Sequence, residues 1–152
     1  EPPEAKVLRQ KPERKDAPIL SLKLIGRMAV IAIVMSVGTM ATFYLAEAIL
    51  HDSAQANTLA FTALVIMQWS SAFSARGTYE SAWQRLKVPH KSFHLAMGAA
   101  IILQLLALFG PLAPIVNIVS VPLPALLLTA VLAFIIPLAI FEIYKKIKKL
   151  NP

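Results

Sequence analysis

AFTALVIMQWSSAFSARG, residues 60–77 of the chain, has the length and composition of a membrane-spanning helix that carries one amide, Gln68, and ends in an arginine, Arg76. A hydrocarbon core of about 30 Å is crossed by roughly 20 apolar residues in a helix. Three other windows are also apolar enough to cross, although the third is slightly short. We therefore predict an all-α membrane protein with four transmembrane helices in a bundle, near residues 28–46, 56–75, 93–109 and 123–141.

The composition agrees with a membrane protein. Of the 152 residues, 57% are hydrophobic, which is more apolar surface than a chain of this size can bury in water. The net charge of +7 lies in blocks separated by long uncharged runs, with few aromatic residues among the basic ones. This pattern favours phosphate-rich membrane surfaces over nucleic acid. We expect a multi-pass integral protein of the cell membrane whose first partner is the lipid bilayer.

The basic residues predict the orientation of the four spans. Every Lys and Arg lies before the first span, between the second and third, or after the fourth: Lys6, Arg9, Lys11, Arg14, Lys15, Lys23, Arg27, Arg76, Arg85, Lys87, Lys91, Lys145, Lys146, Lys148 and Lys149. By the positive-inside rule, both termini and the middle loop face the cytoplasm. The lysine run at the C-terminus is then a topology anchor, with a specific lipid-headgroup site as the less favoured alternative.

Two segments outside the spans have their own character. Residues 1–20 are rich in proline and in charges of both signs, so we expect an extended cytoplasmic segment that lies on another part of the protein, followed by a four-helix transmembrane domain over residues 21–152. Residues 111–124 hold several prolines and predict a loop at the bilayer edge. The chain begins with Glu1, and we expect it to be a processed or partial polypeptide.

Polar side chains inside the membrane are the candidate functional residues, because they usually face protein or a water-filled path. Gln68 lies near mid-membrane, where its amide oxygen could bind a hard cation such as calcium or form a hydrogen bond between helices. Asn57, Gln68 and Ala75 share a helical face flanked by Ser71, and we expect this face to pack against other protein.

Other polar residues favour packing over chemistry. Gln104 has only apolar neighbours in the sequence, so we expect it to hold helices together, and His94 is expected to form interfacial hydrogen bonds. Glu47 and His51 predict a pair at the outer end of the first span, with a proton relay as the alternative. Pro137 predicts a bend in the fourth span, since it leaves the carbonyl of Ala133 without its helical donor.

Close helix contacts and a local ion pair are also predicted. Small residues recur at helical spacing as Ala32 with Ser36, Gly38 with Thr42, and Ser71 with Ala75. Glu142 stands one turn before Lys145 and predicts an ion pair. The chain shows no phosphate-binding glycine loop, no paired carboxylates within a span and no recognisable nucleophile, so we assign no catalytic residue, no cofactor and no firm metal site.

Several short motifs together resemble the C-terminal part of P-type cation-transporting ATPases of the calcium-pump and sodium/potassium-pump group. ANTLAFTALVIMQ, residues 56–68, is similar to the start of that family's eighth helix, and SAFSAR, residues 71–76, to its end. EPPE at residues 1–4, LQLL at 103–106 and FEIYK at 141–145 match the end of the sixth helix, the ninth helix and the end of the tenth. The resemblance covers nearly the whole chain, and its four spans would be helices seven to ten.

The resemblance implies a supporting role. In that family, helices seven to ten brace an ion site built mainly by helices four to six, with one side chain from the eighth helix at the position of Gln68. Ser71 stands where sodium/potassium pumps have an aspartate, and Ala99 and Ala100 where they have glutamates. The initial loop would lie against the cytoplasmic domain, although QKPE at residues 10–13 replaces the family's R-P-P-R. ATP and Mg²⁺ would be bound upstream of this chain.

A second hypothesis is a freestanding four-helix membrane protein that serves as a partner subunit, a small exporter or an assembly factor. An exporter coupled to protons should carry an acid deep within a span, whereas Glu47 lies close to a span's end.

Overall fold

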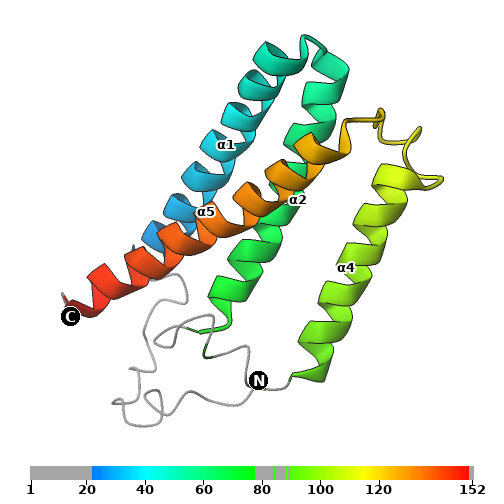
Figure 1. Cartoon of the computed structure of the whole chain (residues 1–152). Coiled ribbons are helices and arrows are strands. Elements are labelled where there is room, and N and C mark those ends of the chain that lie inside the picture. Colours follow the sequence, from blue (N-terminus) through cyan, green and yellow to red (C-terminus); the bar gives the residue numbers. More distant parts are fainter. Residues whose placement is uncertain (1–21, 78–83, 85–87, 89, 151–152) are drawn as a thin grey trace.

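The computed structural model describes residues 22–77, 84, 88 and 90–150 of the 152-residue chain. Four long helices make up the fold: α1 (Leu22–Leu50), α2 (Ser53–Ala75), α4 (Lys91–Phe109) and α5 (Leu123–Leu150) (Figure 1). Each is long and apolar enough to cross a membrane. The predicted all-α, four-span fold is therefore confirmed, while the expected cytoplasmic segment 1–20 lies outside the described residues.

The first and last helices run further than the hydropathy windows predicted. α1 begins at Leu22 and ends at Leu50, whereas α5 continues past residue 141 to Leu150. A hydropathy window finds only the part of a helix that crosses the hydrocarbon, but Lys and Glu are also good helix formers in water. Lys145 Nζ lies 2.9 Å from Glu142 Oε1, so the predicted ion pair is confirmed within the extension.

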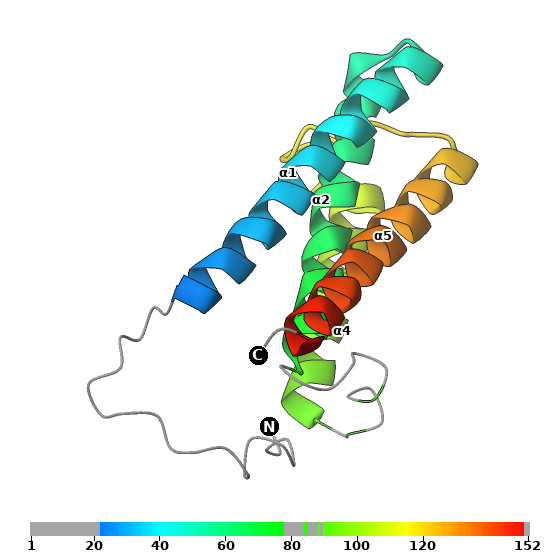
Figure 2. The ribbon, with the colours of Figure 1, turned by 90° about the vertical axis from the view of Figure 1, so that its left-hand side faces the viewer.

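α2 is the central helix of the fold. It packs along α1 and α5, while α4 stands to one side and touches α2 only lightly (Figures 1 and 2). Half of the membrane-crossing window of α2 is buried, against none of that of α1 and about a ninth and a fifth of those of α4 and α5. The other three helices therefore expose most of their apolar side chains, as expected of surfaces that meet lipid or further protein.

Small side chains allow the close contact between α1 and α2. A Cβ placed on Gly38 would lie only 2.5 Å from Met67 Cε, so this position has no room for a side chain unless Met67 moves. Thr42 Oγ1 donates a 2.8 Å hydrogen bond to the carbonyl of Gly38. The Gly38/Thr42 pair thus packs within the chain, whereas Ala32 and Ser36 are exposed.

The turn between α1 and α2 is closed by local hydrogen bonds. His51 adopts a positive φ of 53°, and Asp52 caps α2 by accepting hydrogen bonds from the amides of Ala54 and Gln55 at 2.9 and 3.2 Å. Glu47 Oε1 accepts a 2.6 Å hydrogen bond from Ser53 Oγ. The expected partner of Glu47 was His51; the carboxylate instead meets Ser53, because the turn brings the start of α2 over the end of α1.

The proline-rich segment forms the predicted loop between α4 and α5. Gly110 ends α4 by donating a 3.0 Å hydrogen bond to the carbonyl of Leu106. Further along, the amide of Val119 donates a 3.1 Å hydrogen bond to Oγ1 of Thr58. Thr58 is 2% exposed, so this bond fastens the loop to the buried side of α2. α5 then continues through Pro137, and the predicted bend there stays a prediction.

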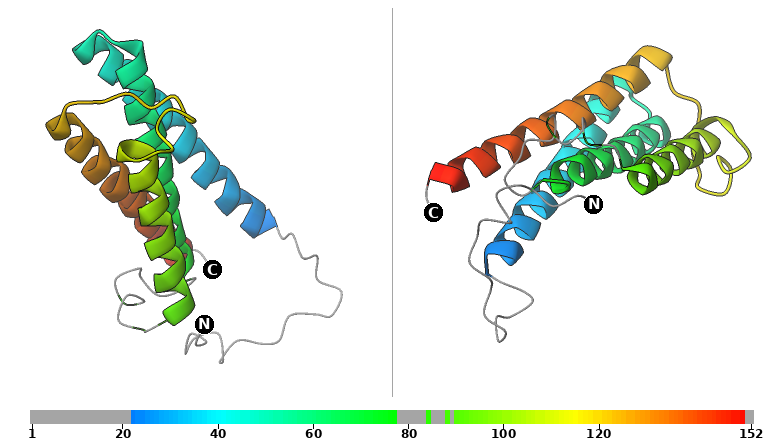
Figure 3. Two further views of the ribbon diagram at one scale, coloured as in Figure 1. Left: turned by 90° about the vertical axis from the view of Figure 1, so that its right-hand side faces the viewer. Right: turned by 90° about the horizontal axis from the view of Figure 1, so that it is seen from below.

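All described helix ends that carry Lys or Arg lie at one end of the molecule. The start of α1, the end of α2, the start of α4 and the end of α5 all lie at that end, spread apart from one another, as Figures 1 and 3 show. This arrangement follows from helices that alternate in direction, and it segregates the described basic residues as the sequence predicted.

Gly38→Leu should separate α1 from α2 and lower stability by about 1–3 kcal/mol, the usual cost of overpacking a filled interior. The measurement is thermal unfolding in detergent followed by circular dichroism, with the midpoint expected to fall by several degrees. Gly98→Leu is the matched control, since a Cβ on Gly98 would meet nothing within 4 Å. Equal midpoints for the two variants would contradict the tight α1/α2 contact.

Thr58→Val should release the α4–α5 loop, because it removes the hydroxyl oxygen that accepts the Val119 amide. We expect faster hydrogen exchange at Val119, measured by mass spectrometry or NMR. Thr62→Val is the control, since the Thr62 hydroxyl donates only to the carbonyl of Thr58 within the same helix. Protection of Val119 that survives in Thr58→Val would show that another contact holds the loop.

Candidate ion-site face of helix α2

One face of α2 is left open by the rest of the described chain. Asn57, Gln68, Ala72 and Ala75 are all exposed, and Ser71 is half-buried at the edge of the same face. At about 100° per residue, Asn57, Gln68 and Ala75 fall on one line along the helix, as the sequence predicted. Phe61, Leu64 and Val65 lie along the same side and are half-buried, so the face combines amide-bearing and small residues with apolar ones.

The opposite face of α2 explains why Gln68 points outward. Buried positions recur every three or four residues there, and many of them are small: Ala56, Thr58, Leu59, Thr62, Ala63, Ile66, Met67, Ser70 and Ser74. Such residues let α1 and α5 approach α2 closely. The side of the helix turned away from them then bears Gln68, seven residues before the last residue of α2, Ala75.

Gln68 and Ser71 could each offer a side-chain oxygen to a cation. Calcium takes six to eight oxygen ligands, so these two residues cannot form such a site alone. No group of three or more His, Asp or Glu side chains that could hold a metal occurs among residues 22–77, 84, 88 and 90–150. Any cation bound at Gln68 must therefore be held largely by groups outside the described part.

Gln104 lies in a different setting. It belongs to α4, is only 6% exposed, and its Nε2 has no hydrogen-bond partner within the described part of the chain. The structure thus buries Gln104 as expected of a packing residue, although its expected role in holding helices together stays a prediction. It does not join Gln68 and Asn57, which lie on the open face of α2.

His94 forms a local contact at the start of α4. Its Nδ1 lies 2.8 Å from the carbonyl oxygen of His90, and the ring of Phe93 stands edge-on to it. His90 in turn caps α4 by accepting the Phe93 amide at 3.1 Å. Both histidines therefore form local contacts at the start of α4. Such contacts agree with the hydrogen-bonding role expected of His94.

Sequence reasoning treated Arg27 and Arg76 only as topology charges. Arg76 is 8% exposed, and its guanidinium contacts the carbonyl of Val88 and the ring of Phe93. Arg27 Nη2 donates a 3.4 Å hydrogen bond to the carbonyl of Ser74. The sequence signal for Arg76 is its place directly after α2, as the C-cap, where the negative end of a helix favours a cation. The aromatic partner of Arg76 is Phe93, which lies 17 residues later in the chain and is brought close only by the fold.

A comparison with protein families identifies the region. Residues 1–147 match the family described as "Cation transporting ATPase, C-terminus". No curated protein was found to match the chain significantly. The matched residues include all four of the membrane-spanning windows. The chain therefore belongs to the cation-transporting ATPase C-terminus family and is a multi-pass membrane part of such a pump.

Proposed function

We propose that this chain braces the ion-binding helices of an ATP-driven cation pump of the calcium-pump and sodium/potassium-pump group, and that Gln68 contributes an oxygen to the ion site. The open face of α2 is the observation that carries the proposal. It presents the amides of Asn57 and Gln68 on a helix whose other sides are covered by its own chain.

The partner of this face is proposed to be a helix that precedes the chain in the complete pump. An amide exposed to hydrocarbon is costly, so a membrane protein normally covers it with protein or lines a water-filled path with it. Ala72 and Ala75 leave room for the backbone of a partner helix to approach. The missing cation ligands would come from that partner, since only Gln68 and Ser71 stand within one turn of each other on this face and Asn57 is eleven residues away.

The chain's part in the reaction is support and positioning. ATP and Mg²⁺ would be bound by upstream cytoplasmic domains, and residues 1–20 would lie against those domains and link them to α1. A calcium-like cation fits an amide oxygen better than a soft metal does, because hard cations prefer oxygen ligands. The absence of Cys from the sequence agrees with this choice of ligand.

Gln68→Ala in the complete pump should raise the cation concentration needed for half-maximal ATPase activity roughly tenfold, about 1.4 kcal/mol, by removing one oxygen ligand. Folding should change little because the side chain is exposed in this part of the pump. Gln104→Leu is the matched control, since it removes a buried amide from α4 and should leave cation activation unchanged. An unaltered activation curve for Gln68→Ala would assign Gln68 to helix packing.

The orientation can be tested with single cysteines, because the chain has none of its own. A cysteine placed at Lys146, near the end of α5, should react with a membrane-impermeant maleimide only after the cytoplasmic side is opened. A cysteine at Ser120, in the α4–α5 loop, should react from outside. Labelling in the reverse order would contradict the positive-inside orientation.

A further inference from the structure

The guanidinium of Arg76 is buried between the end of α2 and the first turn of α4. Arg76 follows the last residue of α2 and is 8% exposed. Burying a charge is costly unless neighbouring groups compensate for the lost water. Two partners are in place here: Nη2 donates a 3.1 Å hydrogen bond to the carbonyl of Val88, and Cζ lies 4.4 Å from the centroid of the Phe93 ring.

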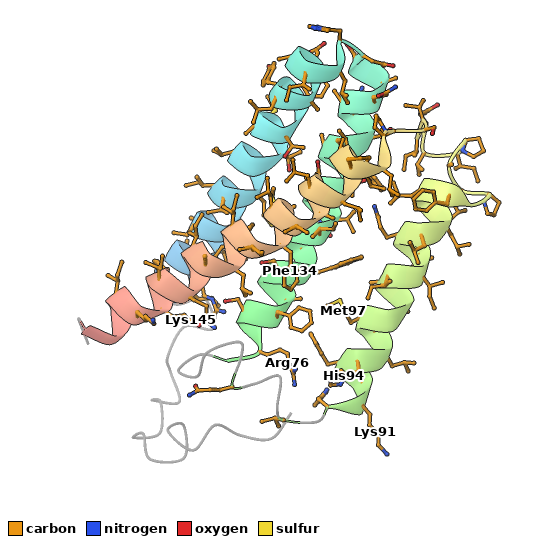
Figure 4. The ribbon with its side chains drawn as sticks, in the orientation of Figure 1. Arg76, Lys91, His94, Met97, Phe134 and Lys145 are labelled. Carbon is orange, nitrogen blue, oxygen red and sulfur yellow. The ribbon has the colours of Figure 1, made fainter. Side chains whose placement is uncertain are left out.

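The Phe93 ring extends this contact through a second residue of α2 to α5. Phe93 lies in the first turn of α4 and meets Phe73 of α2 edge-on, with ring centroids 5.1 Å apart. Phe73 meets Phe134 of α5 in the same way at 5.7 Å. Figure 4 shows Arg76 and Phe134 turned toward the space between α4 and the other helices. Arg76, Phe93, Phe73 and Phe134 therefore form one continuous group, which we call the arginine–phenylalanine clasp.

The clasp holds the first turn of α4, whereas the far end of that helix packs through Leu108 against the core cluster of Ala46, Ala56, Leu59 and Leu126. Only about a ninth of the membrane-crossing window of α4 is buried, and α4 touches α2 far less than α1 or α5 does. The buried amide nitrogen of Gln104, higher on the same helix, has no partner among the described residues. The contacts of α4 with an aromatic ring and a guanidinium of α2 are therefore both made by Phe93, in the first turn of α4.

We propose that Arg76 is a positioning residue that fixes α4 against α2 and α5 through the clasp, and thereby holds the lower part of α2, about two turns from Gln68, in place for cation binding. The effect on cations rests on the function proposed above, while the effect on helix positions does not. A desolvated cation over an aromatic ring is among the stronger polar contacts open to an arginine.

Arginine is suited to this position for a geometric reason. Its planar guanidinium can stack on a ring and donate in its own plane at the same time, which the ammonium group of lysine cannot do. Arg27 provides a natural comparison. It also reaches the end of α2, where Nη2 donates to the carbonyl of Ser74 at 3.4 Å, but it comes from α1.

The test uses distances between spin labels in the complete pump with its other cysteines replaced. Leu95→Cys in α4 and Ile143→Cys in α5 are both exposed, at 77% and 56%, and lie at the end of the bundle that holds the clasp. Arg76→Gln and Phe93→Leu should each widen the distance distribution about twofold, with no further widening when the two are combined. Phe93→Trp should keep it narrow, because indole binds cations at least as well as a phenyl ring.

Cation activation of the ATPase separates positioning from a general loss of structure. In Arg76→Gln, the cation concentration for half-maximal activity should rise roughly fivefold while the maximal rate stays within about twofold. Arg76→Lys should give an intermediate value. Arg27→Gln, the matched control, should change neither the α4–α5 distance nor the cation requirement.

An unchanged distance distribution in folded Arg76→Gln would overturn the clasp. Widened distances with an unchanged cation requirement would overturn the positioning role, as would an equal effect of Arg27→Gln on both readouts. Failure of the proposed function itself is distinguishable, because it would appear as a normal activation curve in Gln68→Ala, a substitution that does not touch the clasp.

Discussion

The close packing of α2 against α1 and α5 is the constraint on which the rest of the structure depends. Small residues such as Gly38 on α1 and Ala63 on α2 let the helices approach, and Met67 fills the space left by the missing side chain of Gly38. Without a hydrophobic driving force between helices in lipid, such contacts supply much of the association energy. Because two sides of α2 are occupied in this way and the α4–α5 loop bonds to Thr58 on a third, the amide of Gln68 remains on the side that the chain leaves open.

In the proposed pump, this chain and the other helices would have different roles at the ion site. α2 offers too few oxygens to hold a hard cation, so a site at Gln68 needs partners from other helices. Under the proposed function the chain would supply rigidity instead, since its turn residues, its anchored loop and its buried arginine contact α2 at different heights. A helix that is restrained along its whole length can keep a single ligand within the few tenths of an ångström that ion coordination requires.

Hydropathy and proline chemistry predicted the four spans, the end of α4 at Phe109 and the loop that follows it, because both are local properties of the sequence. The shared face of Asn57 and Gln68 was also predictable from helical spacing. The partner of Glu47, the burial of Arg76 and the isolated amide of Gln104 were not, because each depends on residues brought together only by folding. The bounds of α1 and α5 exceeded the prediction, since helices do not end where the hydrocarbon does.

The central claim is that another helix of the pump covers the open face of α2. Lipid contact measures this most directly: a single spin label at Ala72, on that face, is compared with one at Leu128, on the exposed side of α5, by collision with lipid-soluble oxygen in the complete pump. The account predicts that the label at Ala72 is shielded and that the label at Leu128 is accessible. Equal accessibility at the two positions would mean that the Gln68 face meets lipid, and it would contradict the account.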